Sequence, residues 1–283
     1  MSGKIYFILG SSRSGSSIFE FLFSKHFQIT ALGELRWLFK RGVLDNEKCG
    51  CGNKFSNCKF WSAYLESFQI KNPKSIDDLR NFFDMPWNLL PLKFKFLRTK
   101  KWKHKWEIYS STISKTYDFL IKENELIVDN SKSPFYLYVL KKSLKHKINI
   151  IYFKRDIRGV VYSYNKTKKR LESNSNLKYM RKKSFLHASF YWIIMDLTCY
   201  FMFLKNNVSN TYIVKYENFC SNPLFYFKKF QVKKSFLNYH AVSGNPDRLK
   251  FSLNGIRFEK PHKYNWFSNL WLSLLSFISL TNK

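Results

Sequence analysis

Short apolar runs recur along the chain, and each is followed by a longer segment with apolar residues at helical spacing. The first unit predicts a strand over residues 4–10, a loop of small residues over 11–17 and a helix over 18–26. The same order recurs with a strand at 148–153 and a helix at 159–170. Because strands that alternate with helices form parallel sheets, we expect an α/β fold with helices on both faces of the sheet.

Further strands are predicted at 125–128 and 211–214, and the long apolar stretch 185–204 predicts a helix. Residues 45–115 break this rhythm, because they hold several cysteines, prolines and a basic aromatic run without a clear apolar periodicity. We predict that they form an irregular insertion over one edge of the sheet. The insertion would lie on the substrate side of a single domain spanning 1–283.

The composition is that of a folded protein with a strongly positive field. The chain has 283 residues, 45% of them hydrophobic, with only 10 Gly and 7 Pro, which excludes disordered and fibrous classes. Lys and Arg outnumber Asp and Glu by 49 to 19, for a formal net charge of +30. A field of this sign favours anionic partners, which include nucleotides, polyanions and membrane surfaces.

The cysteines and the apolar segments indicate in which cellular compartment the protein resides. Five cysteines, three of them within residues 49–58, do not match a disulfide-stapled secreted domain, and the N-terminus lacks the pattern of an export signal. The apolar stretches 190–204 and 266–280 are shorter than the roughly 20 residues that span a bilayer, and the first contains Asp196. We expect buried helices and a cytoplasmic protein, with peripheral membrane contact through the C-terminal stretch as an open possibility.

The loop after the first strand has the glycine spacing of a P-loop, Gly10-x4-Gly15. Its backbone amides, the following helix N-terminus and the hydroxyls of Ser14, Ser16 and Ser17 would bind a phosphate-like group. Ser16 occupies the position of the usual lysine, and Arg13 supplies a cation earlier in the loop, which argues against ATP or GTP hydrolysis. The expected sheet is therefore P-loop-like; the alternative is a serine-rich turn that caps the helix.

A second candidate anion site is Arg155 at the end of the strand 148–153, with Ser163 eight residues later. This motif and the loop at residues 10–17 together resemble the sulfotransferases that use 3'-phosphoadenosine 5'-phosphosulfate (PAPS), in the Arg-Ser-Gly-Ser/Thr branch with carbohydrate, tyrosylprotein and many bacterial members. Residues 13–17, Arg-Ser-Gly-Ser-Ser, resemble its 5'-phosphosulfate loop. Arg155 at the end of a strand, with Ser163 eight residues later, resembles its 3'-phosphate motif. The resemblance implies PAPS as co-substrate, bound by Arg13, Ser14, Gly15, Ser16, Ser17, Arg155 and Ser163.

Other segments extend the resemblance over most of the chain. Residues 127–134 resemble a stretch whose lysine, here Lys132, approaches the transferred sulfonate, and residues 212–219 resemble a late strand of the family. Residues 243–248, which end in Arg248, resemble a Gly-Asn-Pro-x-Arg loop near the nucleotide. The acidic residue that often precedes the final tryptophan is not evident before Trp266, so the C-terminal closure departs from the family.

Sulfonate transfer is an in-line displacement in which the protein mainly positions groups and neutralises charge, and it requires no metal. Arg13 and Lys132 are the predicted catalytic cations. In the resembling branch a Gly-Glu pair after the first helix supplies the catalytic carboxylate, which here is Glu34, our candidate base. The alternative is an exposed loop glutamate paired with Arg36. The six histidines carry no comparable spacing argument.

Two weaker signals lie in the insertion. Cys49, Cys51 and Cys58 resemble a Cys-x-Cys-Gly, Cys-x-Phe-Trp element of bacterial members. Three thiols suit zinc, but the sequence identifies no fourth ligand. A redox-sensitive disulfide, a tight structural turn and simple buried thiols stay open. The basic aromatic run 91–106 resembles a groove for single-stranded nucleic acid, but equally suits an anionic saccharide, a lipid head group or a solvated face.

The predicted function is sulfonate transfer from PAPS to a hydroxyl or amine of a saccharide, lipid or small-metabolite acceptor. The runner-up is a nucleic-acid-binding P-loop protein, which lacks a recognised reading motif, so we expect no specific nucleic-acid partner. A nucleotide kinase is disfavoured by the missing P-loop lysine. The acceptor is chosen by the insertion and the loops, and neither it nor the oligomeric state can be read from the sequence.

Overall fold

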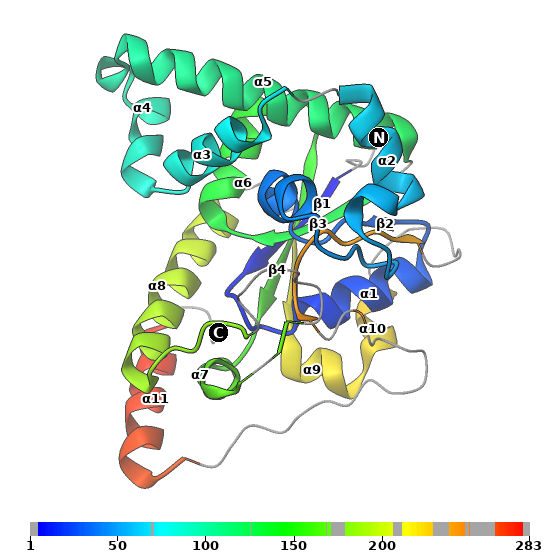
Figure 1. The fold of residues 1–283 in the computed structure, drawn as a ribbon. Helices are drawn as coiled ribbons and strands as arrows, with labels where there is room; N and C mark the ends of the chain where they lie inside the picture. Colours follow the sequence, from blue (N-terminus) through cyan, green and yellow to red (C-terminus); the bar gives the residue numbers. More distant parts are fainter. Residues whose placement is uncertain are drawn as a thin grey trace.

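The computed structural model describes residues 5–68, 71–124, 126–167, 169–170, 179–205, 211–228, 238–246, 249 and 264–279. Its centre is a parallel six-stranded sheet with the strand order β5-β4-β1-β3-β2-β6 (Figure 1). The strands are β1 Ile5–Gly10, β2 Thr30–Ala31, β3 Ile127–Lys132, β4 Ile148–Lys154, β5 Thr211–Lys215 and β6 Asn238–Tyr239. The predicted α/β class with a parallel sheet is confirmed.

Strand β1 is the middle of the sheet and is buried on both faces. Ile5, Phe7 and Leu9 enter one core, and Tyr6 and Ile8 enter the other, because successive side chains of a strand point to opposite faces. A strand between two helical layers needs apolar residues at every position, which is why this run has no polar alternation.

Helices cover both faces of the sheet. Helices α1, α9 and α10 pack on the face of Tyr6, and α2, α3, α5, α6 and α8 pack on the face of Phe7, while α7, α8 and α11 form a third cluster (Figure 1). The bounds are α1 Ser16–His26, α2 Lys59–Phe68, α3 Pro73–Phe83, α4 Leu90–Lys93, α5 Lys100–Glu123, α6 Pro134–Ser143, α7 Ile157–Asn165, α8 Phe185–Leu204, α9 Tyr216–Ser221, α10 Pro223–Phe227 and α11 Trp266–Ile278.

The insertion is helical, so the prediction of an irregular segment over 45–115 is wrong. Helices α2, α3 and α4 and most of α5 fall within or across it, and their buried residues share one core with β1. Five of the seven buried positions in α5 follow one another at intervals of seven, four, four and three residues, which is helical spacing. They are Trp102, Tyr109, Ile113, Tyr117 and Leu120. Lysines interleave with these aromatic residues and obscure the period.

The two apolar helices near the C-terminus differ in exposure. In α8 the Asp196 carboxylate is buried and accepts hydrogen bonds from the Tyr152 hydroxyl at 2.7 Å and the Ser279 hydroxyl at 2.5 Å. Helix α11 leaves several large apolar side chains exposed, namely Trp266, Phe267, Leu270, Leu274, Phe277 and Ile278. Among the described residues, no helix combines the length and apolarity needed to cross a bilayer. Peripheral membrane contact stays a prediction.

Candidate active site

The predicted site residues follow four neighbouring strands at their carboxyl ends. Arg13 comes after β1, Glu34 after β2, Lys132 ends β3, and Arg155 follows β4. The order β4-β1-β3-β2 places these strands side by side, and Lys132 is directly in register with Leu9 of β1. Because the carboxyl ends of parallel strands meet at one edge, the sheet brings the four charged side chains to a common edge, where open α/β sheets bind ligands.

Residues 10–17, which we call the serine loop, form a turn with positive φ at Arg13 (69°) and Gly15 (91°). A Cβ at Gly15 would lie 2.3 Å from the Tyr216 ring, so only glycine fits there. Helix α1 begins behind Gly15 without any side-chain cap, so the alternative of a helix-capping serine turn is wrong. Its uncapped N–H groups are available to an anion.

Two hydroxyls of the serine loop lack a hydrogen-bond partner among the residues that the structure describes. The Ser14 and Ser16 Oγ atoms are buried and make no hydrogen bond to the described residues. A buried hydroxyl without a partner costs about 1–3 kcal/mol, so a ligand that accepts from it would recover that cost. An oxyanion at the N-terminus of α1 has the required chemistry.

Ser17 faces a different segment. Its Oγ accepts a hydrogen bond from the backbone N–H of Asn245 at 3.3 Å, and Ser243 accepts one from Arg41 Nη1 at 2.7 Å. The loop predicted from its Gly-Asn-Pro sequence therefore lies beside the serine loop. Its last predicted residue, Arg248, and residues 259–263 of the segment before Trp266 lie outside the described residues.

Arg155 connects the second motif to the first. Its Nη1 donates to the carbonyl oxygen of Arg13 at 2.9 Å, and its guanidinium lies 4.2 Å from the centre of the Tyr216 ring. A Cβ at Gly159 would lie 2.6 Å from Arg155 Nε, so this face of α7 points at the guanidinium. Ser163 is one turn further along the same face, which directs it to the same side of the site.

Lys132 and Glu34 form an ion pair at the end of β3. The Lys132 Nζ lies 2.7 Å from Glu34 Oε1 and also donates to the Asn130 carbonyl at 2.9 Å. Lys132 itself has a left-handed backbone, with φ of 64°. The alternative pairing of Glu34 with Arg36 is wrong, because the Arg36 guanidinium binds Asp84 at 2.6 Å and Glu34 is only partly exposed.

The electrostatics of Glu34 are set by opposing effects. Burial alone would raise the pKa of its carboxyl group, but the charges of Lys132, Arg41 and Arg36 and the hydrogen bond from Lys132 more than offset this, so the pKa is lowered. Glu34 is therefore ionised at neutral pH and held by a cation. As long as Lys132 stays in place, Glu34 is a weak base.

Glu20 of α1 supports the site and was not predicted. Its carboxylate accepts from the Gly33 backbone N–H at 2.7 Å and from the Asn130 side-chain amide at 2.8 Å, which fixes the residues next to Glu34 and Lys132. Burial raises its pKa to about 7. The signal in the sequence was a carboxylate in an otherwise apolar helical run.

Asp129 within β3 is a second support that sequence reasoning missed. It accepts hydrogen bonds from the Ser131 backbone at 2.8 Å, the Ser131 hydroxyl at 2.5 Å and the Tyr117 hydroxyl. Burial raises its pKa to about 6. The side chain ties α5 of the insertion to the strand that ends in Lys132, and its only signal was a charged residue directly after a buried apolar run.

The basic aromatic run 91–106 divides into anchored and exposed rings. Trp102 is buried and donates its Nε1 to the Asn88 carbonyl at 2.8 Å, whereas Phe96 is 84% exposed. Trp102 is thus a structural anchor of α5, as expected of a solvated basic face with anchoring aromatic residues. Binding of nucleic acid, saccharide or lipid to this segment stays a prediction.

Comparisons with known proteins add little to this geometry. No family model matches the chain, and neither does any curated protein. Two solved structures are similar at 15% identity: the sulfotransferase domain from the Synechococcus PCC 7002 olefin synthase, with a TM-score of 0.49 over 97% of this chain and 94% of that one, and the sulfotransferase domain from the curacin biosynthetic pathway, with a TM-score of 0.48 over 98% of each. Because both TM-scores lie below 0.5, any functional assignment depends on the side chains of the site.

Proposed function

We propose that this chain transfers a sulfonate group from PAPS to a hydroxyl or amine acceptor. The observation that carries the proposal is the contact between its two cationic motifs: Arg155 donates to the carbonyl of Arg13, and Lys132 with Glu34 ends the adjoining strand. A donor with phosphates at both ends of one ribose needs two cationic groups at a single sheet edge. The site offers that arrangement.

Each anionic group of the donor is matched by its own set of protein groups. Arg13, the N–H groups at the start of α1 and the unpartnered hydroxyls of Ser14 and Ser16 suit the 5'-phosphosulfate. Arg155, with Ser163 on the facing side of α7, suits the 3'-phosphate. The absence of a lysine at position 16 speaks against a nucleoside triphosphate in the same loop.

In the proposed reaction the acceptor oxygen or nitrogen attacks the sulfur atom of PAPS. A new bond forms from the acceptor atom to sulfur, the bond from sulfur to the 5'-phosphate oxygen breaks, and its electron pair leaves with 3',5'-adenosine diphosphate. The acceptor proton passes to Glu34, which is ionised in the resting site. Arg13 and Lys132 neutralise the charge that develops on the sulfonate and leaving oxygens.

The Lys132–Glu34 pair links donor binding to base strength. An incoming sulfonate competes with Glu34 for the Lys132 ammonium group, and movement of Lys132 toward the donor removes the cation nearest to Glu34. The loss of that cation raises the pKa of Glu34 and makes it a stronger base. The carboxylate would thus become competent as a base only when donor is bound.

The acceptor side falls to the helical insertion, which shares its core with the sheet and so belongs to one domain in this proposal. A saccharide, lipid or small metabolite with anionic groups suits the net charge of +30. Nucleic acid is the competing partner for the same charge, so the test below includes it.

Thermal unfolding tests the proposal directly. At matched ionic strength, 3',5'-adenosine diphosphate should raise the unfolding temperature, while ATP and a short oligonucleotide should have much smaller effects. Stabilisation by ATP or oligonucleotide alone would overturn the proposal. An acceptor screen with radiolabelled PAPS would then identify the acceptor class, with Glu34→Gln as the inactive control.

A further inference from the structure

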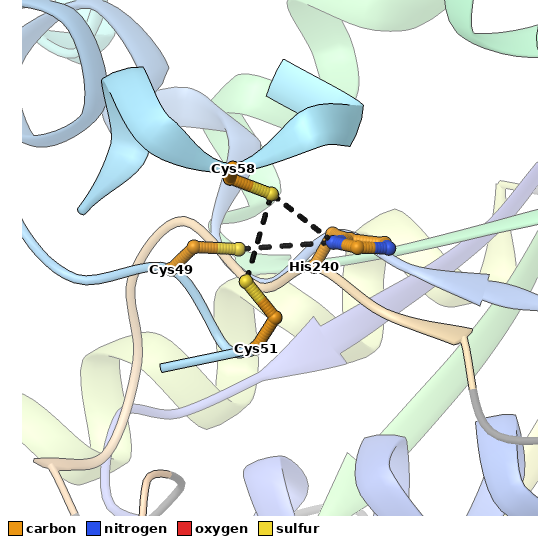
Figure 2. A group of neighbouring side chains, drawn as sticks. All are labelled: Cys49, Cys51, Cys58 and His240. Atoms are coloured by element: carbon orange, nitrogen blue, oxygen red, sulfur yellow. Dashed lines mark hydrogen bonds between the residues drawn. The ribbon is translucent and has the colours of Figure 1, made fainter. Parts of the chain in front are cut away.

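Three cysteines of the insertion meet a histidine from the far end of the chain. Cys49, Cys51 and Cys58 all precede α2, with Cys58 directly before its first residue, and His240 directly follows β6 (Figure 2). One ligand atom from each, the three Sγ atoms and a ring nitrogen of His240, lie within 4.8 Å of one another. The fourth partner that the sequence could not identify for the three thiols is thus His240, which is 191 residues from Cys49.

Three distances within this Cys–His cluster lie close to the edges of a zinc tetrahedron. The Sγ atoms of Cys51 and Cys58 are 3.6 Å apart, and His240 Nδ1 lies 3.4 Å from Cys58 Sγ and 3.9 Å from Cys49 Sγ. Zinc bonds of about 2.3 Å to sulfur and about 2.0–2.1 Å to nitrogen give tetrahedral edges of roughly 3.5–3.8 Å. Small shifts of the side chains would therefore close a complete coordination shell.

The loop that carries the thiols is built to approach β6. Gly50 donates its N–H to the Ala241 carbonyl at 2.9 Å, and a Cβ on Gly50 would lie 2.7 Å from the Tyr239 ring. Gly52 turns the chain with φ of 94°, and its N–H donates to the Cys49 carbonyl at 2.9 Å. Two glycines thus let Cys49 and Cys51 face the same point.

His240 is held on the opposite side by three contacts. Its backbone N–H donates to the Ala31 carbonyl at 2.8 Å, and its carbonyl accepts from Trp61 Nε1 at 2.9 Å. The imidazole stacks on Phe60, with ring centres 4.5 Å apart and planes 7° apart. The ring is therefore oriented before any ligand arrives, as the outer contacts of metal-binding histidines orient theirs.

We propose that these four residues bind a structural Zn²⁺ ion. Three thiolates and an imidazole are the donor set of closed structural zinc sites, and a shell of four protein ligands leaves no open position for catalysis. Three thiolates around Zn²⁺ carry one net negative charge, which the positive field of this chain favours. The proposed transfer chemistry still requires no metal.

A disulfide explains the cluster less completely. A bond between Cys51 and Cys58 would use two of the three thiols and leave Cys49 and the oriented His240 without a purpose. Convergence of all four donor atoms is what a metal requires and a disulfide does not. The disulfide is accordingly a distinct outcome of the test.

The proposed zinc would fasten the insertion to the strand next to the active site. Residues 241–243, immediately after His240, pack against Gly33, where a Cβ would lie 2.7 Å from the Ser243 carbonyl and 2.9 Å from the Val242 nitrogen. Gly33 directly precedes Glu34. The metal would thus hold the segment behind the turn that presents the carboxylate.

Metal analysis of the full chain, purified under reducing conditions without added zinc, tests the proposal. We expect about one zinc ion per chain by elemental mass spectrometry. Cys58→Ser and His240→Ala should lose it, while Cys220→Ser, which alters a thiol outside the cluster, should keep it. Cys51→Ser removes the exposed thiol of the cluster and serves where the variants at buried positions fail to fold.

Two further measurements separate the outcomes. A strong chelator should lower the unfolding temperature of the wild type but not of Cys51→Ser, and Co²⁺ should give thiolate charge-transfer absorption in the wild type only. Zinc-free protein with unchanged stability, or a Cys51–Cys58 disulfide found by alkylation mapping of protein purified without reductant, would overturn the proposal. Stabilisation by 3',5'-adenosine diphosphate is measured separately, so failure of the zinc proposal leaves the transfer proposal intact.

Discussion

The charged edge of the sheet and the Cys–His cluster are both places where distant residues converge, but they are built in opposite ways. At the edge, the two cations Lys132 and Arg155 already bind protein groups, namely the Glu34 carboxylate and the Arg13 carbonyl. In the cluster, three sulfur atoms and one imidazole nitrogen face one another within 4.8 Å.

From this difference we infer that the charged edge suits a ligand that binds and leaves, and that the Cys–His cluster suits an ion that stays bound. A cation with a protein partner can give that partner up to an incoming anion and take it back after product leaves, which suits turnover. Three sulfur atoms and an imidazole nitrogen that lie within 4.8 Å of one another gain most from an ion that stays. Gly33 thus lies between the charged edge, which suits exchange of ligands, and the Cys–His cluster, which suits a permanently bound ion.

Replacement of Glu34, the proposed base, is expected to have the largest effect on this contrast. Glu34→Gln should lower turnover by about 10²-fold to 10⁴-fold, because the acceptor proton loses its destination, while donor affinity is nearly unchanged. Steady-state kinetics with PAPS and isothermal titration with 3',5'-adenosine diphosphate measure the two effects. Turnover equal to that of the wild type would remove Glu34 as the base.

A matched pair of glycine variants compares the serine loop with the loop that carries Cys49 and Cys51. Both Gly15 and Gly52 have positive φ, but only Gly15 has a close neighbour, the Tyr216 ring at 2.3 Å from a built Cβ. Gly52→Ala should lower the free energy of unfolding by about 1–2 kcal/mol because of backbone strain. Gly15→Ala should lower it by about 1–3 kcal/mol more, because the new Cβ would also clash with the Tyr216 ring. Urea unfolding measures both costs. Equal losses would show that Tyr216 moves aside freely.

Loss of Arg155 should have the next effect. Arg155→Ala should weaken binding of 3',5'-adenosine diphosphate by about tenfold to a hundredfold, since a charge-assisted hydrogen bond is worth about 1.5–3 kcal/mol. Arg158→Ala is the control, because Arg158 carries the same charge nearby but pairs with Asp156 at 3.1 Å. Similar losses of affinity in the two variants would mean that the ligand responds to the overall positive charge of this region and not to a specific contact with Arg155.

The smallest expected effect is the pH dependence of the Lys132–Glu34 pair. The folded-state pKa of Glu34 lies below its ordinary value of 4.5, so the pair stabilises the fold above that pH, and this contribution is lost as pH falls through the lowered pKa. We expect about 1 kcal/mol. Lys132→Met should remove this part of the slope of unfolding free energy against pH, whereas Lys40→Met, at a pair that is more exposed than Lys132–Glu34, should not.

The fold could be predicted where a segment carries its own pattern. The helix over 185–204 matches α8 to the residue, and the strands β1, β4 and β5 fall within a residue of expectation. The helix predicted over 159–170 lies instead at Ile157–Asn165, because Asp156 caps it earlier by accepting from the Arg158 N–H. Strands β2 and β6 have only two residues each, too few to show any period, and pairing with neighbours alone defines them.

Most residues of the candidate site could likewise be predicted from local motifs, whereas residues that depend on long-range partners could not. Arg13, Lys132, Glu34 and Arg155 each belong to a short motif next to a strand end, so their common edge followed from topology. Glu20 and His240 carry no such motif. Their roles depend on side chains from other elements, Asn130 for Glu20 and the three thiols for His240, and only folding brings these together.

The positive φ values of Arg13 and Lys132 have a consequence for related chains. A left-handed backbone disfavours a side chain by roughly 1–2 kcal/mol, and glycine would relieve most of that strain. Drift under selection for stability alone would therefore lead to glycine at both positions. In a homologue that keeps this architecture, glycine at either position would mark a chain that has kept its fold and lost a cation that the proposed transfer reaction needs.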